Sequence, residues 1–220
     1  MMRDARARWT LLAFLDEPER RAVTRNAVRR RFRNGDTLFH EGDPGDSMHL
    51  LDRGHVAIRI VSRRGDVVTL DVMEPGDSFG EQALLVPDSR RTASVVAIGA
   101  VETLMLHREA FLDLRRTHPA VTDVLVDILA AQVRRLSRQL LDAHTLSADE
   151  RVVKQLARMA RSFALDGSAS IPLTQEDLAS LAGTTRPTAN RALQPLVADG
   201  VIQLRRGGGD VPDISVLEHR

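Results

Sequence analysis

Glycine-centred turns recur at near-regular spacing through the first half of this 220-residue chain. They read NGD at 34–36, EGDPGD at 41–46, DRG at 52–54, RRGD at 63–66 and EPGD at 74–77. The runs between them alternate apolar and other residues, and in Val67–Val72 this alternation is expected to place Val68, Leu70 and Val72 on one face. Many short strands joined by such turns are typical of an antiparallel barrel or roll. The pattern therefore predicts a β-roll over about residues 31–106.

The chain after Pro119 has a helical pattern, as do residues 10–30. Apolar residues follow one another there at alternating steps of three and four: Val126, Leu129, Val133, Leu136, Leu140 and Ala143. This heptad seam indicates either a helix packed on its own roll or a helix paired with a partner helix. The stripe is narrow, which favours a partner, and a symmetric dimer is the commonest arrangement.

A second domain is expected to begin with the capping box Ser147–Glu150, and its first helix to run to about Leu165. The stretch Leu173–Gly200 then reads as helix, tight turn and helix, with Gly183 at the turn and Pro187 in the first turn of the second helix. Thr174 and Thr185 are expected to cap these two helices. The inward stripe of the second helix comprises Ala189, Leu193, Leu196 and Val197, and its polar face comprises Arg186, Thr188, Asn190, Arg191 and Gln194.

A polar helix face of this kind suits the major groove of DNA, although an ordinary helical hairpin gives a similar pattern. Two short strands around a glycine-rich tip follow, with Arg205 and Arg206 placed to meet a phosphate backbone. The sequence thus predicts a winged helix-turn-helix domain. Pro195, late in the second helix, is expected to kink or shorten it.

Bulk composition excludes several classes of protein. The chain has no cysteine, which excludes disulfides, thiolate catalysis and cysteine-held metal or iron–sulfur sites. The seven histidines show no metal-ligand spacing, and no nucleophile–base pair or carboxylate dyad stands out, so we expect neither a metal site nor an enzyme. No signal peptide or membrane span is evident, and a cytoplasmic protein is expected. The net charge of +1 points to no partner.

The stretch FGEQALLVPDSRRTAS, residues 79–94, carries the most chemistry. Gly80 leads into Glu81, and Arg90, Arg91 and Thr92 follow ten residues later. A carboxylate accepts hydrogen bonds from hydroxyl groups, and an arginine offers paired, fixed donors to a phosphate. A surface ion pair is the simpler alternative, and such pairs contribute little to stability.

In this stretch and in TQEDLASLAGTTRPTANRAL, the chain resembles the catabolite activator/FNR (CRP/FNR) family of bacterial transcription regulators. The resemblance covers nearly the whole chain. It implies an α+β fold with a cyclic-nucleotide-binding β-roll at residues 1–118, a dimerisation helix at 119–145 and a winged helix-turn-helix DNA-binding domain at 146–220. It also implies a homodimer on a palindromic operator, a cyclic nucleotide as effector with cAMP expected, and RNA polymerase as a further partner.

The residues that the resemblance assigns fall into two sets. The cyclic-nucleotide set is Gly80, Glu81, Gln82, Ala83, Arg90, Arg91, Thr92, Leu136 and Ser137, in which Glu81 would accept from the ribose 2′-hydroxyl and Arg91 would hold the cyclic phosphate. The DNA set is Thr174, Thr185, Arg186, Thr188, Asn190, Arg191, Arg205 and Arg206.

Two positions depart from the family pattern. Cyclic-AMP-responsive relatives place a Thr-Ser pair against the adenine, whereas here the positions are Leu136 and Ser137, which puts adenine selection in doubt. The family's Arg-Glu-Thr-x-x-Arg pattern reads here Arg186-Pro-Thr-Ala-Asn-Arg191, so an acid that reads cytosine is replaced by Pro187.

Three other functions stay open at this point. The protein could respond to a different effector, it could regulate without a ligand, or it could be a cyclic-nucleotide-dependent enzyme or channel module. The last has no support in residues 146–220, which contain neither a catalytic constellation nor a membrane segment.

Overall fold

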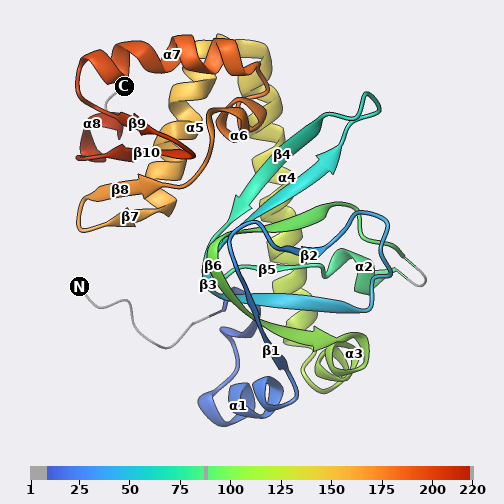
Figure 1. The fold of residues 1–220 in the computed structure, drawn as a ribbon. Coiled ribbons are helices and arrows are strands. Elements are labelled where there is room, and N and C mark those ends of the chain that lie inside the picture. The colour runs from blue at the N-terminus through green and yellow to red at the C-terminus, as the bar shows by residue number, and fades with distance from the viewer. Residues whose placement is uncertain (1–8, 87–88, 219–220) are drawn as a thin grey trace. The chain divides into compact units, whose positions relative to one another are not determined.

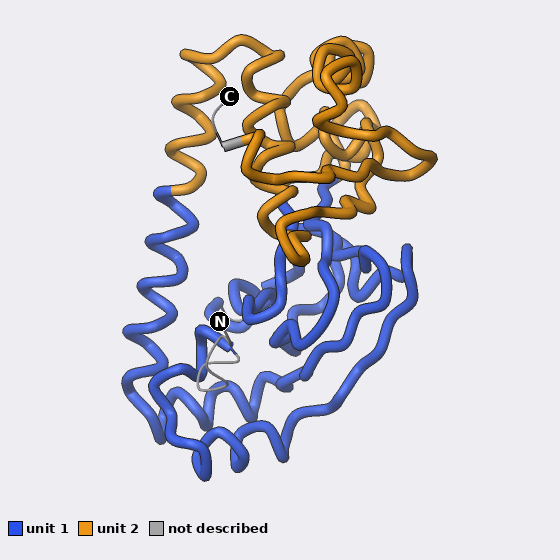
Figure 2. Tube along the Cα trace, turned by 90° about the vertical axis from the view of Figure 1, so that its left-hand side faces the viewer, with its two compact units in different colours: residues 1–60, 71–134 blue, residues 61–70, 135–220 orange. Residues whose placement is uncertain are grey.

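The computed structural model describes residues 9–86 and 89–218 (Figure 1). The chain divides into two compact units: residues 1–60 with 71–134, and residues 61–70 with 135–220 (Figure 2). Each unit is described by itself below. Within the described residues, no helix is long and apolar enough to cross a membrane.

The first half of the chain forms the predicted antiparallel roll. Its elements are a 3-10 helix at Thr10–Leu12, α1 (Glu17–Arg25), β1 (Val28–Phe32), β2 (Thr37–Phe39), β3 (Ser47–Val61), β4 (Val67–Met73), β5 (Ser78–Phe79), α2 (Gln82–Leu85), β6 (Ser94–His107) and α3 (Arg108–Thr117). The sheet order is β1-β6-β3-β4, with β2 paired to β6 and β5 paired to β3. The long strands β3 and β6 pair antiparallel from Ser47↔His107 to Arg59↔Ser94, with register shifts around Arg53.

Two apolar clusters fill this unit. The first joins the N-terminal segment and α3 to the sheet, through Trp9, Leu12, Leu50, Leu106 and Phe111 among others. The second lies around Leu51, Val56, Phe79 and Val95. Because most of these side chains are less than 5% exposed, their burial is the main stabilising contribution to the roll.

Strand β4 buries polar residues. Thr69 and Asp71 are almost fully buried, whereas Leu70 between them is 44% exposed. Leu70 and Val72, which were expected on the same face, differ in burial, because Val72 is only 6% exposed. Thr69 and Asp71 both have interaction partners, which offsets the cost of burying their polar groups.

Helix α4 (Ala120–Thr145) carries two separate apolar stripes. Val121 and Leu125 are buried in the first cluster of the roll, and Val124 and Ile128 pack against that cluster. The heptad seam lies elsewhere on the helix, because four of its members are more than half exposed: Val126, Val133, Leu136 and Leu140. Packing of these four residues on their own roll is therefore wrong as an explanation of the seam.

The second unit contains α5 (Ala148–Ser162), β7 (Ala164–Leu165), β8 (Ser168–Ile171), α6 (Gln175–Leu181), α7 (Arg186–Ala198), β9 (Gln203–Arg205), β10 (Gly208–Val211) and α8 (Ser215–Glu218). Its sheet order is β7-β8-β10-β9, antiparallel throughout. Helix α5 ends at Ser162, earlier than expected, because Ala164 and Leu165 pair with β8 instead.

Side-chain caps begin three of these helices. Ser147 accepts from the backbone N–H of Glu150, whose carboxylate accepts from the backbone N–H of Ser147, and Thr174 with Asp177 repeats the arrangement at α6. Thr185 caps α7. Helix α7 continues through Pro195 to Ala198, so of the expected kink or shortening, the shortening does not occur: the proline lacks one donor, but its carbonyl still accepts from the N–H of Asp199.

The glycine-rich segment of the wing differs from expectation, because Gly208 and Gly209 belong to strand β10 and only Gly207 lies at the tip. Arg205 pairs with Gly208, which leaves Arg206 and Gly207 as the turn. Gly208 is buried in β10, and a Cβ there would overlap the carbonyl oxygen of Ile171. This glycine therefore permits close strand packing and adds no flexibility to the tip.

Candidate functional site

The turn after β5 brings Gly80 and Arg91 together although they are eleven residues apart. Gly80 has φ of +88°, a conformation that glycine adopts without strain. A Cβ at this position would lie 2.7 Å from Nη1 of Arg91. The glycine is therefore required both by the turn and by the guanidinium beside it.

Arg91 is held inside the roll. It is only 5% exposed; its Nη1 donates to the Gly80 carbonyl at 3.1 Å and its Nη2 to the Ser47 hydroxyl at 3.0 Å. The exposed carboxylate of Asp46 lies 3.6 Å from Nη2. Arg90, in contrast, is exposed and donates to the Gly42 carbonyl at 2.8 Å. Of the two adjacent arginines, the fold thus places Arg91 beside Gly80.

Glu81 is the buried acid next to this arginine, with 5% exposure. Its Oε2 atom and the Nε atom of Arg91 are buried and have no hydrogen-bond partner among the described residues. Burial raises the pKa of the Glu81 carboxyl, opposed by a backbone hydrogen bond and by the charge of Arg91. Burial lowers the pKa of the Arg91 guanidinium, opposed by Asp46, Asp43 and Glu81. One acceptor and one donor are thus left for a molecule that offers a hydroxyl and an anionic oxygen.

Aromatic side chains lie against the inner side of this site. The Arg91 guanidinium carbon is 4.1 Å from the centroid of the Phe39 ring. Phe39 contacts His49 at 6.0 Å between centroids, and His49 stacks on Phe79 at 5.2 Å with parallel planes. Burial, followed by the nearby charge of Arg91, lowers the pKa of His49 to about 3, so its ring is neutral at physiological pH.

Arg108, at the start of α3, holds the short helix α2 in place. Its guanidinium donates to the carbonyls of Gly45, Ala83 and Leu84 at 2.6, 2.9 and 3.3 Å. Gly45 and Ala83 are so close that a Cβ on Gly45 would overlap that of Ala83. Position 45 therefore requires glycine beside Ala83, a residue that the family resemblance assigns to the nucleotide-binding set.

The other predicted members of the nucleotide set are exposed. Gln82 lies on α2, where its amide is 3.5 Å from that of Gln132 on α4, and Thr92 follows Arg91 directly. Leu136 and Ser137 are exposed neighbours on α4. Sequence reasoning missed Phe39, Ser47, Asp46 and Arg108. Asp46 is the last residue of the EGDPGD turn and Ser47 follows it, but nothing in their spacing linked them to residue 91.

Helix α7 presents the predicted polar face. Ala189, Ala192, Leu193 and Leu196 are buried, whereas Arg186, Asn190, Arg191 and Gln194 are exposed. The Gln194 amide donates to the Asn190 side-chain oxygen at 2.9 Å. Thr174 and Thr185 are exposed at the starts of α6 and α7, and Thr188 is half-buried.

Two of the predicted DNA-contacting arginines have acidic partners in the structure. Arg191 lies 3.1 Å from the carboxylate of Asp149, and Arg205 lies 3.2 Å from that of Asp210 and donates to the Ser170 hydroxyl. All four charged side chains are more than 40% exposed, so both pairs are weak. The exposed Arg206 lies at the turn of the wing.

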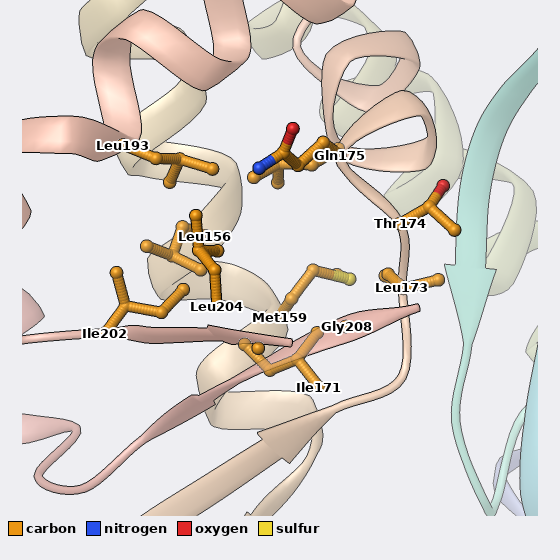
Figure 3. A pocket seen from close by; sticks show the side chains of 12 residues that line it. Leu156, Met159, Ile171, Leu173, Thr174, Gln175, Leu193, Ile202, Leu204 and Gly208 are labelled. Atoms are coloured by element: carbon orange, nitrogen blue, oxygen red, sulfur yellow. The ribbon is translucent and has the colours of Figure 1, made fainter. Parts of the chain in front are cut away.

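An apolar pocket lies in the core of the second unit, where side chains of α5, α6 and α7 converge above the sheet (Figure 3). Leu156, Met159, Leu193 and Ile202 are among its lining residues. Its volume of about 20 Å³ is room for about one water molecule. The pocket therefore belongs to the packing that holds the wing against the helices.

An antiparallel roll that holds a buried arginine against the turn with a buried acid, followed by a long helix and a winged helix-turn-helix, is the architecture of a class of ligand-binding transcription regulators. Two family models match the chain, the cyclic nucleotide-binding domain over residues 29–118 and the Crp-like helix-turn-helix domain over residues 150–220.

Similar proteins point to one family. The chain is 32% identical over 193 residues to the CRP-like cAMP-activated global transcriptional regulator of Mycobacterium tuberculosis, covering 86% of each protein. It is 35% identical, with the same coverage, to the cyclic AMP receptor protein of Thermus thermophilus. The Thermus thermophilus catabolite activator protein structure has a TM-score of 0.56 at 32% identity, covering 96% of this chain and 97% of that one. The chain belongs to the CRP/FNR family and is a CRP-like transcriptional regulator.

One solved structure of lower sequence identity shares the fold alone. The c-di-GMP-responsive global regulator CLP of Xanthomonas campestris aligns with a TM-score of 0.75 at 20% identity, over 90% of this chain and 99% of that one.

Proposed function

We propose that this regulator binds a cyclic nucleotide, first of all cAMP, at the site formed by Gly80, Glu81 and Arg91, and binds a palindromic DNA operator as a homodimer. The observation that carries the proposal is the buried acceptor on Glu81 beside the buried donor on Arg91, both without protein partners among the described residues. Unsatisfied buried polar atoms are costly, and a bound ligand can satisfy them.

The chemistry of the two side chains assigns their roles. Glu81 would accept a hydrogen bond from a ribose hydroxyl, because an ionised carboxylate only accepts. Arg91 would donate to the cyclic phosphate through the N–H groups that Gly80 and Ser47 do not use. Thr92 is exposed next to Arg91, where its hydroxyl can serve the same anion.

The preference for one base is expected to be weak. By the family resemblance, Leu136 and Ser137 would meet the base, and Leu136 has no group that donates or accepts. Loss of one hydrogen bond lowers affinity by on the order of 1 kcal/mol when no buried group is left unpaired. Both relatives described above carry cAMP in their names, which makes cAMP the first ligand to test.

The exposed seam on α4 supports the homodimer. Val126, Val133, Leu136 and Leu140 recur at heptad positions and are 54% to 62% exposed. Water contact along such a stripe is unfavourable, and an identical helix would cover it. We therefore place the nucleotide-binding roll at residues 1–118, the dimerisation helix at 119–145 and the DNA-binding domain at 146–220.

The polar face of α7 would enter the major groove. Arg186 and Arg191 can contact guanine, whereas Pro187 cannot accept from cytosine as a glutamate would. The operator is therefore expected to be related to the family palindrome but relaxed at the base pair that the missing acid would read. Arg206 on the wing would meet phosphate, and RNA polymerase is the protein partner that the family implies.

Ligand binding would act by shifting a population between two arrangements of the dimer. A ligand changes such an equilibrium only through its different affinity for the two states. In a twofold dimer, the two α7 helices would address half-sites about one duplex turn apart.

Calorimetric titration of cAMP and cGMP into the wild type and Arg91→Ala tests the proposed nucleotide site. We expect binding to the wild type and at least about a tenfold loss in the variant. Equal affinity in the two proteins would refute the assignment of the site.

Selection of bound duplexes from a random DNA pool, with and without cAMP, tests the proposed role of the DNA-binding domain. A twofold-symmetric consensus that is enriched more strongly with cAMP is the expected result. Enrichment without symmetry would contradict the dimer, and enrichment that ignores the ligand would contradict the proposed control.

A further inference from the structure

The guanidinium of Arg91 is held in place by three protein groups. The Gly80 carbonyl holds one terminal nitrogen, the Ser47 hydroxyl holds the other, and the Phe39 ring covers one face with its centroid 4.1 Å from the guanidinium carbon. Two hydrogen bonds and a ring contact determine the position and the plane of the group.

This arrangement uses only some of the donors of Arg91. A guanidinium has five N–H groups, of which the Gly80 and Ser47 contacts occupy two, and the buried Nε has no hydrogen-bond partner among the described residues. A ring face attracts a cation without occupying any N–H group. Phe39 thus restrains the arginine while leaving donors for an anion.

We infer that Phe39 is a positioning residue for ligand binding, which holds the Arg91 guanidinium in the plane that a phosphate requires. The inference rests on the proposed function of Arg91. It goes further by assigning part of the phosphate affinity to Phe39, a side chain that makes no hydrogen bond. Because Phe39 already restrains the Arg91 guanidinium, the guanidinium loses less conformational entropy when it binds a phosphate.

The surroundings of Phe39 support this role. The ring lies within an aromatic cluster, 6.0 Å from His49 and 6.1 Å from Phe79 between centroids, so it is itself held in place. His49 is neutral at physiological pH and therefore does not repel the cation that Phe39 attracts. A hydrogen bond between His49 Nδ1 and the Thr103 hydroxyl at 3.0 Å fixes the histidine ring in turn.

The test measures cAMP and cGMP binding by calorimetry in graded variants at position 39. Phenylalanine analogues with one, two or three ring fluorines keep the shape of the ring and progressively weaken its attraction for a cation. We expect affinity to fall with each fluorine, to about fivefold below wild type for the trifluoro ring and for Phe39→Leu. Phe32→Leu is the matched control, because Phe32 packs partly buried against the same apolar cluster; it should leave affinity unchanged.

A second measurement does not need ligand. Unfolding of the ligand-free wild type, Phe39→Leu, Arg91→Met and the double variant forms a cycle, followed by the fluorescence of Trp9, the one tryptophan of the chain. A coupling between positions 39 and 91 is expected.

The outcomes separate the two proposals. If the wild type binds, Arg91→Met does not, and the fluorinated rings bind as tightly as phenylalanine, the role of Phe39 is overturned while the proposed function stands. Zero coupling in the unfolding cycle overturns that role as well. If the wild type and Arg91→Met bind equally, or neither binds, the proposed function fails and the positioning role fails with it.

Discussion

His49 should make the roll sensitive to mild acid. Its side chain is 3% exposed and its pKa is lowered from 6.5 to about 3, chiefly by burial and then by the charge of Arg91. In the unfolded chain the ring takes up a proton near pH 6.5, whereas in the folded chain it stays neutral until about pH 3. The stabilisation is therefore complete above about pH 6.5 and is lost progressively as the pH falls toward 3.

The magnitude follows from these two values. Between about pH 7.5 and pH 5, the unfolded state binds a proton at His49 that the folded state does not bind. The difference in bound protons, integrated over this pH interval, is about 1.5, which corresponds to a loss of about 2 kcal/mol of unfolding free energy. Replacing the histidine by glutamine removes this contribution and keeps a neutral polar side chain. His49→Gln should therefore lose about 2 kcal/mol less than the wild type over this interval, whatever its stability at the higher pH.

Urea unfolding at the two pH values, followed by Trp9 fluorescence, measures this difference. Trp9 is buried and its indole N–H donates to the Leu51 carbonyl at 3.1 Å, so it reports on the sheet that contains His49. The exposed His144→Gln is the matched control and should behave as wild type. Equal losses in the wild type and His49→Gln would refute the reasoning, because they would show that the folded roll accepts the proton without cost.

Four further changes have defined expectations. Gly80→Ala should weaken cAMP binding by at least about tenfold in calorimetry, since its Cβ would displace Arg91 and φ of +88° is strained for alanine; unchanged affinity would contradict the geometry. Val133→Asp should shift the protein toward monomer in sedimentation velocity, and an unaltered dimer would remove the seam from the interface. Pro187→Glu should restore about tenfold discrimination for cytosine in DNA selection, unless α7 does not read that base. Ser147→Ala should cost about 1 kcal/mol in unfolding followed by circular dichroism, and no loss would mean that the cap of α5 is dispensable.

Local chemistry made much of the fold predictable. Caps act within four residues, so Ser147, Thr174 and Thr185 correctly predicted where α5, α6 and α7 begin. The glycine turns and the alternation between them likewise predicted the roll. The alternation does not determine which face is buried, however, and polar residues with partners occupy the inner face at Thr69 and Asp71.

The candidate site was predictable only in part, because its members come from separate strands. Family resemblance identified Gly80, Glu81 and Arg91, and the fold places Gly80 and Arg91 in contact. Phe39 and Ser47 could not be found this way, since their contacts with Arg91 depend on the pairing of strands far apart in sequence. Pro195 shows the opposite limit: a local rule predicted a kink or a shorter helix, whereas α7, which buries Leu193 and Leu196, continues to Ala198.

The acid partners of Arg191 and Arg205 have a consequence for the search along a genome, provided that both arginines contact DNA as proposed. Each arginine would then leave Asp149 or Asp210 before it meets the DNA, an exchange of one ion pair for another. Residues 147–220 also contain nine basic and nine acidic side chains, so the domain carries no excess of positive charge to attract an arbitrary duplex. We therefore expect weak binding to random sequence and rapid dissociation from wrong sites.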